Sequence, residues 1–225
     1  MAMMALRRVC LHAGLRRTLA VSSLRPAALR TGVANFSSAG QNVSKVLENE
    51  IKHEDEQYEQ QKEIQNFIKN SGFDFSETPG DVNMTLTKKV GNKTVKIEWQ
   101  LSSPFDPEQM DEEGGGPEAT DMVISVESEA GAGLSFYCST QTGEDHRYVI
   151  GQVKAYASSA ERDSATSYNG PEFEDLDDKL QEALDEYLAE LGMSNEVCDF
   201  VDAVALDKEQ REYVRWLKTT KTFVE

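Results

Sequence analysis

The sequence predicts an α+β domain in which helices flank an antiparallel sheet. Residues 43–70 carry an apolar stripe of helical period, residues 82–156 contain five short runs that alternate apolar with polar residues, and a second helical stripe begins at Leu176. Helices bury every third or fourth residue and half-buried strands bury every second one, so each change of period marks a change of structure. Strands grouped in one stretch, with helices in others, are typical of the α+β class.

Residues 1–40 differ sharply in charge from the rest of the chain. They contain no acidic residue and six arginines: Arg7, Arg8, Arg16, Arg17, Arg25 and Arg30. The whole chain has 23 basic and 40 acidic residues, so 17 basic and 40 acidic residues remain after residue 40, a formal charge of −23. An Arg-rich, acid-free leader is typical of mitochondrial targeting, and arginines interrupt every candidate core of a secretory signal.

We therefore expect residues 1–40 to be a cleaved mitochondrial targeting leader and residues 41–225 to form one domain in the mitochondrial matrix. The length of the second part suits a single domain. The alternative is a basic arm that stays attached and binds nucleic acid. The strong negative charge of residues 41–225 disfavours that alternative.

The first predicted element is a helix over residues 43–70. Val43, Leu47 and Ile51 are spaced by four residues, no Pro or Gly intervenes, and Gly72 follows as a stop signal. Acidic residues crowd the other positions, so only a narrow face can be buried. We expect this helix to lie along a groove or against another helix.

Five strands are predicted next. Residues 82–101 form a hairpin about a turn at Gly91-Asn92, because apolar residues alternate on both sides of it. Residues 102–119, rich in Gly, Pro and acids, are predicted to be a loop. Alternation resumes at residues 122–126, 134–138 and 148–156, with a turn at residues 131–133. Sequential short strands joined by short turns predict an antiparallel meander.

The C-terminal third is predicted to be helical. Leu176, Leu180, Leu184 and Leu188 form a row, and Gly192 stands where a C-terminal glycine is favoured. Ser194 is expected to cap a short helix over residues 197–204. Asp207 and Gln210 resemble a capping box, which predicts a separate last helix with an aromatic stripe: Tyr213, Trp216 and Phe223.

No catalytic constellation is evident, so we expect no catalytic, cofactor-binding or metal-binding residues and a protein that is not an enzyme. The nearest approach to a nucleophile and base is Cys138 with His146, which lacks an orienting group. The carboxylates of residues 175–178 lack the glycine and distal glutamate of a calcium loop. Residues 114–116 are glycines followed by Pro117 rather than by the lysine of a phosphate loop. The open alternatives are a thiol- or metal-dependent matrix enzyme and a low-affinity divalent-cation buffer.

The charge of the domain predicts its partners. A body at −23 repels nucleic acid and attracts basic proteins, such as mitochondrial ribosomal or nascent proteins. His53 is expected on a solvated helix surface. Two basic clusters are expected to be solvated or paired within the chain: Lys88, Lys89, Lys93 and Lys96, and then Arg211, Arg215, Lys218 and Lys221. No segment approaches the roughly 20 apolar residues of a membrane span.

The C-terminal residues resemble the mitochondrial acidic matrix protein family, also called the mitochondrial glycoprotein or complement globular-head-binding protein family. The resemblance covers residues 43–225 in order of elements. It is most specific in these segments: Tyr168-Asn169-Gly170-Pro171-Glu172-Phe173, Leu176-Asp177, Leu180-Gln181, Tyr187-Leu188, Gly192, Lys208-Glu209, Tyr213, Trp216-Leu217 and Phe223-Val224.

The resemblance implies an N-terminal helix, a twisted antiparallel seven-stranded sheet, two C-terminal helices and a ring-shaped homotrimer with one acidic face. It carries over no catalytic residue. This chain departs from the pattern in having only five readable strands and a brief turn at residues 141–145. The expected function is a trimeric scaffold or chaperone-like binder of basic partners, which supports mitochondrial translation and oxidative phosphorylation without a membrane span or sequence-specific nucleic-acid binding.

Overall fold

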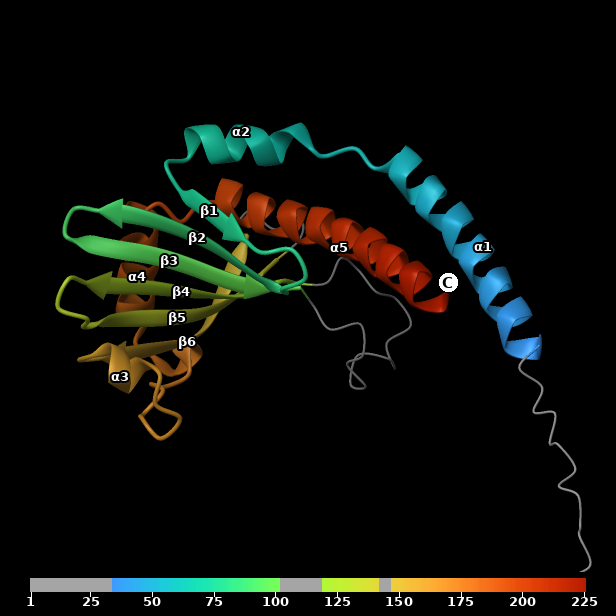
Figure 1. The fold of residues 1–225 in the computed structure, drawn as a ribbon. Helices are drawn as coiled ribbons and strands as arrows, with labels where there is room; N and C mark the ends of the chain where they lie inside the picture. Colours follow the sequence, from blue (N-terminus) through green and yellow to red (C-terminus); the bar gives the residue numbers. More distant parts are fainter. Residues whose placement is uncertain (1–33, 102–118, 142–146) are drawn as a thin grey trace, which may run out of the picture.

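A six-stranded antiparallel sheet, with helices on one of its faces and a helical arm beyond it, makes up the computed structural model (Figure 1). The structure describes residues 34–101, 119–141 and 147–225, with side chains from Ala39 onward. The predicted α+β class is confirmed. The predicted loop over residues 102–119 lies almost entirely outside the described residues.

The sheet is a simple meander in which each strand pairs with the next one in sequence. The strands are β1 (Asp74–Glu77), β2 (Asn83–Val90), β3 (Lys93–Gln100), β4 (Asp121–Ser128), β5 (Gly133–Thr140) and β6 (Tyr148–Tyr156). All five predicted strands are confirmed. Six strands lie in the described residues rather than the seven that the resemblance implied, because β1 adds one to the five. Its four residues include a single apolar one, Phe75, so the sequence shows no alternation there.

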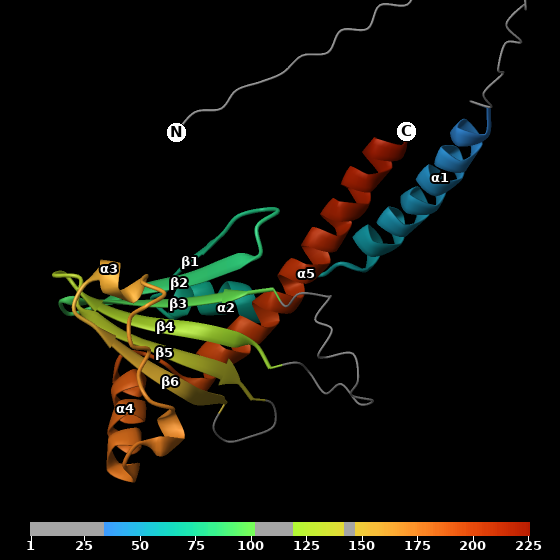
Figure 2. The same ribbon diagram turned by 90° about the horizontal axis from the view of Figure 1, so that it is seen from below.

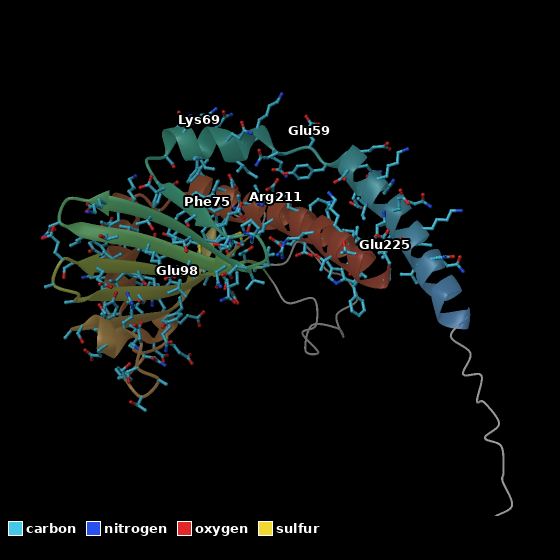
Figure 3. All side chains as sticks on the ribbon, viewed as in Figure 1. Glu59, Lys69, Phe75, Glu98, Arg211 and Glu225 are labelled. Carbon is cyan, nitrogen blue, oxygen red and sulfur yellow. The ribbon has the colours of Figure 1, made fainter. Side chains whose placement is uncertain are left out.

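The core lies between one sheet face and the helices behind it. Alternate residues of the central strands are buried there, and α5 supplies a matching apolar row. The main members are Met84, Leu86, Val95, Ile97, Trp99, Met122, Ile124, Phe136, Cys138, Val197, Phe200, Val201 and Val204. Phe200 stacks on Phe67 at 4.3 Å and meets Phe75 edge-on at 5.4 Å, so aromatic contacts join α2, β1 and α5. Figure 3 shows Phe75 beside α5.

The helices are α1 (Ala34–Gln57), α2 (Lys62–Asn70), α3 (Ser159–Arg162), α4 (Asp178–Glu190) and α5 (Asn195–Val224), with a 3-10 turn η1 (Phe173–Asp175) before α4. The prediction of one helix over residues 43–70 is wrong, because the chain leaves helical structure at residues 58–61. This break changes the chain's direction. As a result α1 follows the outer half of α5, while α2 lies nearer the sheet and buries Ile64 in the core (Figure 1).

The predicted division of the C-terminal region at Asp207 is also wrong. α5 is one helix of 30 residues, and Asp207 lies inside it. The Asp207 carboxylate accepts a hydrogen bond from Arg211 Nε at 2.8 Å, four residues on, rather than capping a new helix. The end of α4 is as predicted, because Gly192 follows its C-cap with a φ of 106°.

The outer half of α5 and α1 form an arm that extends beyond the sheet, as both views show (Figures 1 and 2). The two helices run antiparallel: Ser44 donates to Glu225 at one end, and Tyr58 donates to Asp207 at the other. Leu47 and Leu217 are buried in the arm. The first residues of α1 lie within the predicted leader, so the leader boundary stays a prediction.

Candidate functional site

The residues considered for thiol chemistry lie in the core. Cys138 on β5 and Cys198 on α5 are both buried. Burial disfavours the charged thiolate and raises the pKa of each thiol to about 12. His146, the base considered for Cys138, lies outside the described residues. Neither described thiol has the lowered pKa that an activated nucleophile needs.

The carboxylates of residues 175–178 serve the start of α4. Asp175 ends η1, and Asp177 caps α4 by accepting a hydrogen bond from the Lys179 amide at 3.1 Å. Asp178 is the first residue of α4, where the helix dipole favours a negative charge. Within the three described stretches, no group of three or more His, Cys, Asp and Glu side chains is placed to hold a metal ion.

Most lysines of the first predicted basic cluster have a partner within the chain. Lys93 donates to Tyr187 at 2.8 Å, and Lys96 meets Glu98 at 2.6 Å. Lys88 donates to the Ser71 carbonyl at 3.2 Å. His53 is exposed on α1, with a ring nitrogen 3.0 Å from the Gln57 amide nitrogen.

The arm, defined as residues 34–57 and 207–224, has almost balanced charge. It contains seven basic and eight acidic residues, a formal charge of −1. Lys218 meets Asp55 at 3.2 Å and Lys221 meets Glu48 at 3.8 Å, each across the two helices. Tyr213 also donates to Glu50 at 3.3 Å. Most acids of α1 are therefore paired with, or hydrogen-bonded to, groups on α5.

A second helical region is very different in charge. Residues 172–199, which we call the acidic segment, comprise η1, α4 and the first turn of α5. They contain eleven acidic residues and the single base Lys179, a formal charge of −10. Asp199 pairs with Arg147 at 3.2 Å, and Asp185 accepts a hydrogen bond from Tyr148 at 2.6 Å. The other nine are exposed and form no ion pair with any residue the structure describes: Glu172, Glu174, Asp175, Asp177, Asp178, Glu182, Glu186, Glu190 and Glu196.

The acidic segment lies on the body of the molecule, since Leu188 and Leu191 anchor α4 in the core. Its carboxylates therefore form a fixed source of negative potential rather than a mobile tail. Exposed charges act over a Debye length of about 8 Å at physiological salt, so neighbouring carboxylates on one helix reinforce each other. Such a surface attracts cations and basic proteins and speeds their association.

A buried charge network marks the point where the arm leaves the sheet. Lys208 is fully buried, and its Nζ contacts Glu77 Oε2 at 3.1 Å, the Thr78 carbonyl at 3.1 Å and Glu212 Oε1 at 3.5 Å. Arg211, labelled in Figure 3, donates to both oxygens of Glu77 at 2.8 and 3.0 Å. The network fastens β1 to α5.

From the sequence, Lys208 was noted only in one of the segments that resemble the family, although the sequence contains a signal for its burial. Val197, Val201 and Val204 form the buried row of α5 at spacings of four and three. The next position in that row is Lys208 itself. A lysine in line with an apolar row predicts a buried charge, which requires partners such as Glu77.

A second cluster that the sequence did not reveal ties the sheet to α5. Asp202 accepts hydrogen bonds from Thr120 at 3.0 Å, from Thr140 at 2.9 Å and from Arg147 at 2.9 Å. These donors stand beside β4, at the end of β5 and just before β6. Their convergence depends on the register of the sheet, which no spacing along the chain displays. The cluster is a structural tie that holds the strands to the helix.

No helix in the described stretches combines the length and the apolar character needed to cross a bilayer.

Two solved structures share the fold. A Leishmania major protein of unknown function, described as a sequence homologue of human p32, aligns with a TM-score of 0.67 and 18% identity over 83% of this chain and 99% of that one. The Trypanosoma brucei p22 protein aligns with a TM-score of 0.68 and 20% identity over 84% of this chain and 100% of that one. At this identity the likeness concerns the fold.

Two curated relatives carry mitochondrial names. An uncharacterised mitochondrial protein of Arabidopsis thaliana is 28% identical over 158 residues, which make up 68% of this chain and 62% of that protein. The chain thus aligns with less than two thirds of that relative's length. The mitochondrial acidic protein mam33 of Schizosaccharomyces pombe is 35% identical over 57 residues, 25% of this chain and 21% of that protein.

The family model described as mitochondrial glycoprotein, MAM33, matches residues 47–224. This range includes the sheet, both C-terminal helices, α2 and the last eleven residues of α1. The resemblance noted in the sequence is confirmed, and this chain belongs to the mitochondrial glycoprotein family.

Proposed function

We propose that this protein is a non-enzymatic acidic scaffold or chaperone-like binder of basic proteins in the mitochondrial matrix. The observation that carries the proposal is the acidic segment, with nine exposed carboxylates that have no ion pair among the described residues. Basic partners, such as mitochondrial ribosomal or nascent proteins, would be held there by charge. Support of mitochondrial translation and oxidative phosphorylation is the setting we propose for this binding.

The contrast with the arm supports this assignment of the acidic segment. Where acids serve the fold, as Asp55 and Glu48 do, the chain supplies lysines opposite them. Glu182, Glu186 and Glu190 instead follow one another at intervals of four residues on α4. Like charges at this spacing destabilise a helix. A stability cost that the fold does not need favours a role in binding.

We further propose that the protein is a homotrimer assembled through the arm. Several apolar side chains of the arm are exposed in the single chain: Val43 at 45%, Val46 at 67%, Trp216 at 58% and Phe223 at 90%. Apolar residues grouped on paired helices are typical of subunit interfaces. The ring arrangement itself is an expectation from the family resemblance.

The thiol alternative is disfavoured by the buried cysteines, whose pKa values are raised to about 12. The divalent-cation alternative predicts saturable binding of Ca²⁺ near millimolar concentration. Titration calorimetry of the protein with Ca²⁺ distinguishes it from the present proposal, which expects no stoichiometric site.

Fluorescence anisotropy with a labelled 12-residue peptide of six lysines and six alanines tests the proposal. The variant Glu182→Gln/Glu186→Gln/Glu190→Gln should bind the peptide about tenfold more weakly, since each 1.4 kcal/mol is a factor of ten in affinity. The matched control, Glu48→Gln/Asp55→Asn/Glu56→Gln, removes three acids that have lysine partners and should bind nearly as the natural protein does. Equal losses in the two variants, or binding that added salt leaves unchanged, would contradict the proposal.

A further inference from the structure

The sheet face opposite the helices contains a groove of about 1150 Å³. Figure 1 views this face, with α4 and the first half of α5 behind the strands. One row of paired residues crosses it from β2 to β6: Thr85, Glu98, Val123, Tyr137 and Gln152. At one end, the chain around α3 covers the sheet and buries Ser135 and Lys154. The rest of the groove is open, and none of the helices in the described residues fills it.

Gly151 on the groove floor is a glycine that the fold does not require. It is the extra residue of a β-bulge, because Tyr137 pairs with Gln152 and Cys138 pairs with Ile150. Its φ is not positive, and an added Cβ would meet only the Tyr137 carbonyl oxygen, at an ordinary 3.7 Å. Glycine within a strand costs stability relative to residues with a side chain. A glycine within a strand often marks a bulge or a place where a ligand or another backbone approaches closely, and the space above Gly151 allows such an approach.

The groove floor around Gly151 offers both apolar surface and an unused hydroxyl. Tyr137 is 38% exposed and Val149 is 41% exposed. Among the described residues, nothing hydrogen-bonds to the Tyr137 hydroxyl. A bulge that re-aims neighbouring side chains is common beside functional sites. The groove floor thus has no side chain at Gly151, and a partner can contact the exposed side chains of Tyr137 and Val149 beside it.

The charges of the groove fit a basic occupant. Its lining includes three carboxylates, from Glu98, Asp121 and Asp163, and one guanidinium, from Arg162. Arg162 is already engaged, with Glu127 at 2.7 Å and Asp163 at 2.8 Å. Figure 3 labels Glu98 on the sheet. Glu98 is also paired, with Lys96 at 2.6 Å, so Asp121 is the lining carboxylate that has no ion pair among the described residues. The described lining residues still carry three acids against one base, a formal charge of −2, and include no unengaged cation.

We infer that this groove binds an extended, basic segment of a partner protein, with the segment's backbone against Gly151 and its side chains beside Tyr137 and Val149. The inference rests on the proposed function only for the charge of the partner. The length of the groove, measured across the strands, suits a short extended segment. Four strand spacings from β2 to β6 span about 19 Å, the length of about six extended residues. In a helix the side chains surround the backbone in a cylinder about 10 Å across, so a helical segment could not bring its backbone against Gly151 as an extended segment can.

Two labelled 12-residue peptides of equal charge test the inference by anisotropy. One alternates lysine with threonine and favours an extended chain, while the other is the lysine–alanine peptide used above, which favours a helix. In Gly151→Val the new side chain fills the groove floor. The alternating peptide should then bind at least about tenfold more weakly, and the lysine–alanine peptide should bind as before. Unchanged binding of both peptides would overturn the inference.

The fold is checked separately, because valine is favoured in strands and its Cβ has room. Gly151→Val should therefore keep or raise the midpoint of thermal unfolding. If it fails to fold, Tyr137→Ser leaves the backbone unchanged and should weaken binding of the alternating peptide alone. No selective effect of Tyr137→Ser in that case would also overturn the inference.

The outcomes separate this inference from the proposed function. If the α4 triple variant binds both peptides more weakly and Gly151→Val binds both as the natural protein does, the acidic segment is retained as the binding surface and the groove is rejected. Selective loss in Gly151→Val that is insensitive to salt would retain the groove and reject the electrostatic function. A change of sedimentation coefficient in Gly151→Val would mean that a second copy covers this face, and the inference would fail.

Discussion

The arm and the acidic segment are both helical and both rich in acids, yet most acids are paired in the arm and most are unpaired in the acidic segment. In the arm, eight acids face seven bases, and their pairs lie within α1, within α5, between α1 and α5 or between α5 and β1. In the acidic segment, eleven acids face one base. The arm therefore uses charge within the fold, whereas the acidic segment presents it to solvent. Net charge alone therefore does not locate a binding surface, because only unpaired charge is available to a partner.

The largest expected effect concerns the buried end of the arm. Lys208→Ala leaves Glu77 and Glu212 without their buried partner, so it should lower the free energy of unfolding by about 3–5 kcal/mol. Lys218→Ala removes the same charge from the same helix, but its pair with Asp55 is half-exposed and should contribute at most about 1 kcal/mol. Urea denaturation of both variants checks the contrast. Equal destabilisation would mean that burial does not distinguish the two pairs.

The next effect concerns the apolar surface of the arm. Trp216→Ser/Phe223→Ser removes two exposed side chains, so it should dissociate the proposed trimer with little effect on the fold of one chain. Analytical ultracentrifugation checks the assembly, and circular dichroism checks the fold. The control Leu206→Ser alters an exposed leucine of α5 outside the arm and should leave the sedimentation coefficient unchanged. A natural protein that sediments as a monomer at all concentrations would refute the trimer.

The two regions should also respond with opposite sign to the loss of one acid. Glu186 stands four residues from both Glu182 and Glu190, so Glu186→Gln should stabilise the protein by roughly 0.4–1 kcal/mol at low salt. Glu56 pairs with Lys52 on the arm, so Glu56→Gln should destabilise by a few tenths of a kcal/mol, as for other pairs at this spacing. Thermal unfolding at low and high salt measures both. Destabilisation by Glu186→Gln would mean that its charge serves the fold.

The sequence predicted most of the sheet, because alternating burial leaves a period of two that needs no knowledge of distant contacts. It did not predict the break at residues 58–61, which contains no Pro or Gly. That break exists because α1 and α2 pack on different parts of α5, and this is a tertiary cause. Asp207 and Gln210 matched a capping box, yet the same residues are compatible with a helix interior when a side chain such as Arg211 binds the carboxylate.

The candidate surfaces were predicted less completely than the fold. The total charge of the domain was evident, and the density of acids on α4 can be counted in the sequence. Which acids are paired depends on α1 lying against α5, so the distinction between arm and acidic segment required the structure. The groove was hidden for a similar reason, since Tyr137, Val149 and Gly151 become neighbours only through the register of β5 and β6.

The smallest expected effect is a dependence on pH at the junction of the arm. Burial alone would raise the pKa of Glu212, but the hydrogen bond from the Gly80 amide at 2.7 Å and the charge of Lys208 outweigh it and lower that pKa below 4.5. A carboxylate whose pKa is lower in the folded state adds stability above its unfolded pKa and loses it as the pH falls through the folded value.

Glu212→Gln should therefore be less stable than the natural protein near pH 7, and the difference should shrink as the pH falls below about 4.5. Urea denaturation across this range measures it. The control Glu182→Gln, in the acidic segment, should not lower the stability near pH 7, because its carboxylate has no ion pair among the described residues. A stability difference for Glu212→Gln that stays constant down to the acid transition would mean that the Gly80 and Lys208 contacts do not favour the charged form.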